Sequence, residues 1–108
     1  MIKMQIVMDK DRIAREQKYN PDKIQAALDN YMVEKLHLQK EDEGFYLGTN
    51  PQKDFSRFGL AFSTLSDQEW FLANVKTWLY FNSDSSDDPN DFVIEDFKDF
   101  CLRQSAAV

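Results

Sequence analysis

The first eight residues of the chain alternate between apolar and more polar side chains. Ile2, Met4, Ile6 and Met8 take every second position, with Lys3 among the residues between them. A period of two is typical of a strand that turns one face toward a core. Residues 2–8 are therefore predicted to form the first strand of a sheet.

A helical period follows. Asn20 can cap free backbone N–H groups, and Pro21 is best tolerated in the first turn of a helix. The apolar residues of one helical stripe come next: Ile24, Ala27, Leu28, Tyr31, Met32 and Leu36. This spacing predicts a helix over about 21–36. Residues 9–19 are mostly charged, and the pattern there fits either a loop or a short solvated helix.

Two short apolar segments predict further strands. Residues 45–47 (FYL) are closed by the turn formers of residues 48–51. Phe58, Leu60 and Phe62 alternate with small residues, which is a strand pattern. Because only about nine residues separate the two segments, we expect them to pair antiparallel as a hairpin.

The second half of the chain has two further helical patterns. Residues 66–69 (SDQE) form a capping-box sequence, and the helix predicted from there ends near Asn82. Its apolar stripe consists of Phe71, Leu72, Val75, Trp78 and Leu79. Residues 83–91 contain no apolar side chain and are predicted to be an exposed acidic loop. Residues 92–104 carry a last helical stripe, and 105–108 are expected to fray.

The order β-α-β-β-α-α predicts a two-layer α+β domain over residues 1–108, with helices packed on one face of a small three-stranded mixed or antiparallel sheet. A length of 108 residues suits one domain, and 43% hydrophobic residues with three Gly and three Pro exclude general disorder. The two edges of such a sheet leave homodimerisation by strand pairing open. No apolar run approaches the ~20 residues of a membrane-spanning helix, so we expect a cytoplasmic protein without membrane contact.

The net charge is concentrated in one part of the sequence. Thirteen Lys and Arg against nineteen Asp and Glu give a formal charge of −6. Residues 1–65 carry ten acids and ten bases, whereas residues 66–108 carry nine acids and three bases. The whole net charge therefore belongs to the last 43 residues. This balance disfavours direct binding of nucleic acid, even at the Lys53–Phe58 segment, where two bases alternate with aromatic residues.

The residues that usually carry catalysis are scarce. One cysteine, Cys101, and one histidine, His37, can form neither an internal disulfide nor a Cys/His zinc site. Cys101 lies on a predicted apolar stripe and His37 at a predicted helix end, where structural roles are usual. The three glycines are isolated, so no phosphate-binding loop is present. We expect no catalytic residues, no cofactor and no metal.

One alternative is a calcium-regulated loop. Asp84, Ser86 and Asp88 take positions one, three and five of an EF-hand loop, and Glu95 takes position twelve. Pro89 stands where the sharp turn of that loop requires glycine. The match is weak, and a solvated loop followed by a capped helix explains the same residues.

The sharpest functional hypothesis combines aromatic and acidic residues. If the helix reaches Asn82, the aromatic residues off its main stripe border the acidic loop. The predicted partner-binding residues are Trp70, Tyr80, Phe81, Asp84, Asp87, Asp88, Asp91 and Asp96. Size, composition and charge favour a non-enzymatic cytoplasmic binding protein, similar in kind to a small bacterial accessory protein, that engages a basic protein partner. It would act as an inhibitor, an immunity-type protein or a DNA mimic; an oligomer-forming structural domain is the other alternative.

Overall fold

A five-stranded antiparallel sheet forms one layer of the protein in the computed structural model, which describes residues 2–83 and 92–106. The strand order is β2-β3-β1-β4-β5. The strands are β1 (Ile2–Met8), β2 (Gln39–Lys40), β3 (Phe45–Leu47), β4 (Val75–Asn82) and β5 (Val93–Asp96). The helices are α1 (Lys10–Glu16), α2 (Pro21–Asp29), the π-helix η1 (Asn30–Lys35), the 3₁₀ turn η2 (Asp42–Gly44), α3 (Asp54–Ser66), α4 (Glu69–Leu72) and α5 (Phe97–Ala106).

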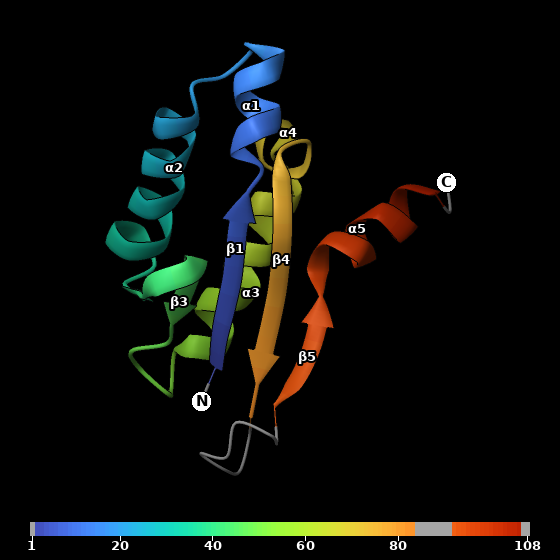
Figure 1. The fold of residues 1–108 in the computed structure, drawn as a ribbon. Coiled ribbons are helices and arrows are strands. Elements are labelled where there is room, and N and C mark those ends of the chain that lie inside the picture. The colour runs from blue at the N-terminus through green and yellow to red at the C-terminus, as the bar shows by residue number, and fades with distance from the viewer. Residues whose placement is uncertain (1, 84–91, 107–108) are drawn as a thin grey trace.

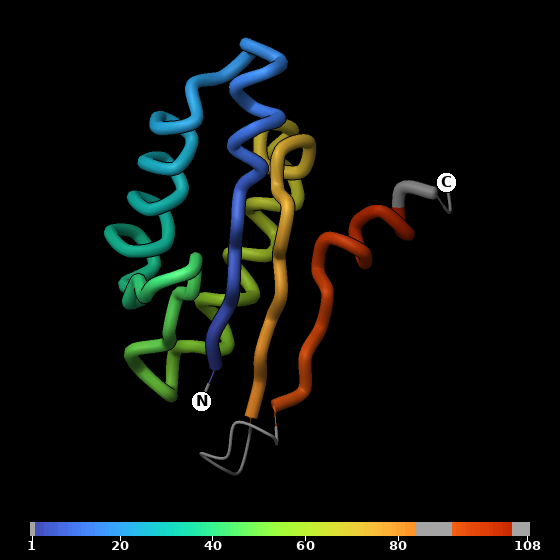
Figure 2. Tube along the Cα trace, viewed as in Figure 1, coloured from blue at the N-terminus to red at the C-terminus, as the bar shows by residue number. Residues whose placement is uncertain are grey.

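The helices are placed unevenly around the sheet (Figure 1). The first four strands and the helices between them follow the order of a split β-α-β arrangement, with β3 lying between β1 and β2. Helix α3 lies behind β1 and β4, α2 lies on the β3 side, and no helix of the described residues lies in front of the two central strands. The tube in Figure 2 shows β5 and α5 continuing on the opposite side from α2. The sheet therefore has one covered face and one open face.

The core lies between the sheet and α3. Met4 of β1 pairs with Tyr46 on one side and Tyr80 on the other, and Ile6 pairs with Trp78. All five side chains are buried, because residues paired across strands share a face of the sheet. The core side of α3 is formed by Phe58, Ala61 and Leu65.

Several predictions from the N-terminal half are confirmed. The strands at 2–8 and 45–47 are present, and the predicted helix over 21–36 is formed by α2 and its continuation η1. Asn20 caps α2 by accepting hydrogen bonds from the backbone N–H groups of Asp22 and Lys23. The undecided segment 9–19 contains helix α1, whose first turn is capped by Asp9. The α+β class is also confirmed.

The predicted third strand at Phe58, Leu60 and Phe62 is wrong, because this segment lies inside helix α3. The buried residues of α3 are Asp54, Phe58, Ala61 and Leu65, which follow the spacing of one helical face. Leu60, which the strand pattern places in the core, is exposed. The alternation of large and small residues is compatible with a strand. The segment is nevertheless a helix, because its helical face packs against the sheet.

The predicted helix over 66–82 is also wrong. Apart from Ser66, only the four residues of α4 are helical, and residues 75–82 form strand β4 between β1 and β5. The capping-box hydrogen bonds are not made: Ser66 is the last residue of α3, and its Oγ donates to the carbonyl of Ser63. The sequence VKTWLYF is rich in β-branched and aromatic residues, and its pairing with β1 and β5 outweighs its helical periodicity.

The predicted last helix begins later than expected, and the sheet is larger. Residues 93–96 form the edge strand β5, and α5 starts at Phe97. Asp96 caps α5 by accepting a hydrogen bond from the backbone N–H of Asp99 at 2.9 Å. The three-stranded sheet and its β-α-β-β-α-α order are therefore corrected to five strands, because β2, β4 and β5 were missing from the prediction and the third predicted strand is helical.

Candidate functional site

An open groove runs between α3 and the C-terminal elements β5 and α5. Its volume is about 710 Å³. Helix α3 forms one wall, α5 forms the other, and Tyr80 and Asn82 of β4 lie among the lining residues. We call this hollow the C-terminal groove; its lining residues are Phe55, Phe58, Gly59, Phe62, Tyr80, Asn82, Ile94, Glu95, Asp96, Phe97, Phe100 and Arg103.

Stacked rings hold the inner side of the groove in place. Phe97 lies 4.7 Å from Phe62, 5.4 Å from Trp78 and 5.2 Å from Tyr80, between ring centroids. The Tyr80 pair is almost parallel, with an interplanar angle of 11°. Offset and edge-to-face ring pairs of this kind add to the stabilisation from burial alone. Helix α5 is thereby attached to both the sheet and α3.

The outer side of the groove exposes large apolar side chains. Phe55 is 71% exposed and Phe100 44%. These residues come from two different elements, α3 and α5, and both line the same hollow. Contiguous apolar surface of this kind is typical of interaction sites, whereas single exposed apolar residues are common.

Acidic side chains edge the groove on the β5 side. Glu95 and Asp96 both line it, and Glu95 makes no ion pair with any residue in the described ranges. Arg103, the basic residue of the lining, is paired with Asp99 at 3.0 Å. The charge that the groove presents to a ligand is therefore negative.

An unmatched acceptor lies at one end of the groove. The side-chain oxygen of Asn82 is buried and accepts no hydrogen bond from the described part of the chain. A buried amide oxygen without a donor costs free energy. A ligand that brings N–H groups to this end of the groove would complement it.

The aromatic residues predicted to bind a partner lie on three different surfaces. Because residues 75–82 form a strand, Tyr80 and Phe81 point to opposite faces of the sheet. Tyr80 is 8% exposed and contributes to the C-terminal groove. Phe81 lies on the open face, and Trp70 lies on α4. The predicted single aromatic ledge along one helix is therefore wrong.

Phe81 belongs to an aromatic cluster on the open face of the sheet. The ammonium group of Lys3 lies 5.0 Å from the ring centroid of Phe45, 5.3 Å from that of Phe81 and 5.0 Å from that of Phe92. A cation over aromatic ring faces is attracted by their negative potential. The cluster is occupied by the protein's own lysine and connects β1, β3 and β4 with the residue before β5.

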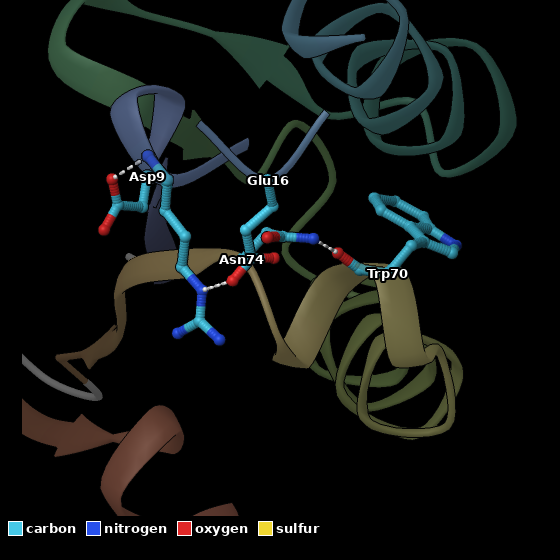
Figure 3. A network of polar contacts seen from close by, with 5 residues as sticks. Asp9, Glu16, Trp70 and Asn74 are labelled. Atoms are coloured by element: carbon cyan, nitrogen blue, oxygen red, sulfur yellow. Dashed lines mark hydrogen bonds and ion pairs between the residues drawn. The ribbon is translucent and has the colours of Figure 1, made fainter. Parts of the chain in front are cut away.

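Trp70 lies at the end of the sheet where α1 and α4 meet. Its indole N–H donates to the side-chain oxygen of Gln68 at 3.2 Å, and its carbonyl accepts from the side chain of Asn74 at 2.9 Å. Figure 3 shows this end, with Asp9 capping the neighbouring helix. Asn74 in turn accepts from the backbone N–H of Asp9 at 2.7 Å. These contacts hold Trp70 at this end of the sheet, where it lines a separate hollow with residues of α2.

The acidic residues of the prediction are described only in part. Asp84, Asp87, Asp88 and Asp91 lie outside the described residues, as does most of the candidate calcium loop. Asp96 lies at the end of β5 and lines the C-terminal groove. Within residues 2–83 and 92–106, no group of three or more His, Cys, Asp or Glu side chains is placed to hold a metal ion.

His37 and Cys101 belong to different parts of the fold. His37 precedes the edge strand β2, and its carbonyl accepts a hydrogen bond from Thr49. Cys101 lies on α5, packs against the core and lines a hollow with residues of α4, so no contact among the described residues joins a nucleophile to a base here. Burial raises the pKa of the half-buried Cys101 thiol, which lowers its reactivity.

A polar cluster that the sequence did not indicate holds the β2–β3 side together. The Asp29 carboxylate accepts hydrogen bonds from the Tyr46 hydroxyl at 2.6 Å, from Lys40 at 2.6 Å and from Gln25 at 3.1 Å. Burial alone would raise the pKa of Asp29, but these hydrogen bonds hold it below its usual value. Burial and the neighbouring carboxylate raise the pKa of Tyr46 well above its usual value.

The comparisons with known proteins give no relative: no family model, curated protein or solved structure matches this chain. In the described part of the chain, no helix is both long and apolar enough to cross a bilayer. The C-terminal groove is the candidate functional site of the described chain.

The prediction missed the groove residues of α3 and α5. Phe62 falls in the segment predicted to be a strand, and Phe97 and Phe100 fall in the predicted last helix. A sequence pattern does not say which elements lie side by side, so it does not place these residues in one groove. A helical reading of residues 54–66 would have given a signal, because α3 has more apolar residues than its buried stripe needs. Phe55 and Leu60 lie outside that stripe.

Proposed function

We propose that this chain is a non-enzymatic cytoplasmic protein that binds a positively charged partner protein through the C-terminal groove. The observation that carries the proposal is the coincidence of exposed aromatic surface and acidic side chains in one hollow. Phe55 and Phe100 supply apolar contact area, and Glu95 and Asp96 supply negative charge beside it. Apolar centres with polar rims are the usual anatomy of protein interfaces.

The charge distribution of the sequence supports a basic partner. The whole net charge of −6 comes from residues 66–108, the part of the chain that contains β5 and α5. An electronegative surface accelerates encounter with a basic protein and repels acidic ones. The same charge disfavours direct binding to a nucleic-acid backbone. An inhibitor or immunity-type protein, or a DNA mimic, that blocks the basic groove of a nucleic-acid-binding enzyme would have these properties.

Affinity capture from native extract at low and high salt tests the proposal, with variants that separate the groove from the rest of the surface. We expect Phe55→Ala and Glu95→Lys to lose a basic partner that the wild type captures at low salt and releases at high salt. Phe55 and Glu95 both line the groove. Both substitutions are at exposed positions, so the fold should be retained.

Two matched controls should keep the partner. Leu60→Ala removes an exposed apolar side chain from the same helix outside the groove lining, and Glu34→Lys reverses an exposed charge on η1. Equal capture by the groove variants and the controls would overturn the proposal. A wild-type bait that captures no basic protein at low salt would overturn it as well.

A further inference from the structure

Gly59 lies in the middle of α3, and no contact within the described residues explains why this position is a glycine. Glycine in a helix interior is destabilising relative to alanine, because it loses more backbone freedom on folding. A Cβ atom built at Gly59 meets no heavy atom within 4 Å, so no neighbour requires its absence. Gly44, by contrast, has a φ of 82°, and a Cβ at Gly48 would collide with the carboxylate of Asp54.

Gly59 faces the C-terminal groove. It lines the groove together with Phe55, Phe58 and Phe62 of the same helix. These four residues have the spacing i, i+3, i+4 and i+7, which places them on one stripe about 10 Å long. A missing side chain at the centre of this stripe lets another backbone approach α3 closely, as small residues do where two helices pack together.

The other lining residues define the chemistry of an occupant. Phe97 and Phe100 of α5 offer an apolar wall opposite α3. Glu95 and Asp96 edge the groove with negative charge, and the buried Asn82 oxygen has no donor among residues 2–83 and 92–106. An occupant therefore needs an apolar stripe with basic groups beside it.

We propose, on the basis of the function proposed above, that the groove takes an amphipathic helix of the partner protein, whose apolar stripe packs over Gly59 and whose Lys or Arg residues face Glu95 and Asp96. A helix fits because both walls are helices and because the α3 stripe is a ridge of helical spacing with a gap at its centre. An added strand would instead pair with the edge of β5, where Gly59 has no effect.

Synthetic peptides of about 18 residues test this inference on the full-length protein, since isolated helices shorter than about 12–15 residues are marginal. A Leu/Lys peptide with apolar residues at i, i+3, i+4 and i+7 is compared with an alternating Leu/Lys peptide of the same composition. A Leu/Glu peptide with the helical pattern is the charge control. Binding is measured by calorimetry and mapped by amide chemical shifts. We expect only the helical Leu/Lys peptide to bind, with shifts at Phe55, Phe62 and Phe100.

Gly59→Ala is the decisive variant, because its expected effects on folding and on binding have opposite signs. The added methyl group raises helix propensity, so the melting temperature should rise. The same group occupies the space over the stripe, so affinity for the helical Leu/Lys peptide should fall about tenfold, as expected for overpacking. Ser56→Ala is the matched control: it also raises helix propensity at an exposed position of α3, but Ser56 is not a lining residue.

Unchanged peptide affinity in Gly59→Ala would overturn the helix inference, and so would preferred binding of the alternating peptide. If no peptide binds while capture of the basic partner still depends on Phe55 and Glu95, the helix inference fails and the proposed function stands. If capture depends on neither residue, the proposed function fails too.

Discussion

The two edges of the sheet are stabilised in different ways. At the β2–β3 edge, polar groups are matched: one carboxylate, Asp29, accepts hydrogen bonds from three side chains of α2, β2 and β3. At the β5 edge, aromatic rings attach α5, while Val93 and Ile94 stay mostly exposed. Covering exposed apolar surface with a partner is favourable, whereas covering polar groups that already have hydrogen-bond partners contributes little to binding. The binding capacity of the molecule is therefore expected at β5.

The largest effect is expected from Phe97→Ala, which removes the ring that joins α5 to Phe62, Trp78 and Tyr80. Truncation of a packed phenylalanine should lower the free energy of unfolding by about 3 kcal/mol. Amide hydrogen exchange should show the loss first in β5 and α5, because these elements depend on the ring contacts. The β1–β3 pairing should stay protected.

Phe100→Ala is the control for this variant, because Phe100 is 44% exposed and, among the described residues, makes a single ring contact, with Phe62. It should cost about 1 kcal/mol or less, since less apolar surface is lost from the interior. Equal loss of protection across both edges in Phe97→Ala would contradict the distinction between them.

Asp29→Asn tests the other edge. The substitution removes the negative charge that pairs with Lys40 and accepts from Tyr46, so we expect a loss of about 2 kcal/mol at pH 7. Chemical denaturation measures it. Leu36 and the rest of the α2–η1 stripe are untouched, so the fold should be retained.

The pH dependence of this variant has a definite sign. The pKa of Asp29 is lower in the folded protein than its usual value of 3.8. Its contribution to stability is therefore fully present above about pH 4 and is lost as the pH falls through the lower folded value. The difference between wild type and Asp29→Asn should be constant from pH 5 to 8, by this principle, and shrink below about pH 4. A difference that persists at about pH 2 would show that the carboxylate charge is not responsible.

Gly59→Ala should stabilise the protein by about 0.5–1 kcal/mol, since the helix gains propensity and no atom obstructs the new methyl group. Thermal and chemical denaturation measure the gain. Destabilisation would mean that α3 has a neighbour at this position, which would reduce the contrast between the β5 edge and the β2–β3 edge.

The smallest effect on stability is expected from Arg103→Gln at the groove. Its ion pair with Asp99 is an exposed i, i+4 pair, so the loss should be about 0.5 kcal/mol or less. Affinity for a basic partner should increase a few-fold at low salt, because a positive charge leaves the groove and Asp99 is released. Weaker binding of the basic partner would contradict the electrostatic account of the β5 edge.

Sequence patterns correctly predicted the segments whose apolar residues follow either the strand period or the helical period, but not both. Residues 2–8 alternate without a competing helical stripe, and residues 21–36 carry a long stripe with a cap at Asn20. Residues 54–66 and 75–82 satisfy both periods, and both were assigned wrongly. In these segments the choice depends on the neighbour: β4 is a strand because β1 and β5 pair with it on either side.

The sequence predicted the negative charge of the candidate site, but only some of the residues that line it. Tyr80 and Asp96 were predicted and line the C-terminal groove, while Trp70 and Phe81 lie on other surfaces. Phe97 and Phe100 were missed as binding residues because both fall in the predicted last helix, and Phe55 because it lies outside every predicted helix and strand. Phe55 and Phe100 reach the groove because α5 leaves the sheet beside α3.

The sequence by itself determined the α+β class, the strand at 2–8, the helix over 21–36, and the concentration of negative charge in the last 43 residues. These properties depend on local periodicity and on composition. Only the tertiary structure decided that α3 and α5 form the two walls of one groove, and that Gly59 lines it between Phe55 and Phe62. The reason is physical: a groove is formed by side chains distant in sequence, and their separation in space follows from strand pairing and ring packing rather than from any local pattern.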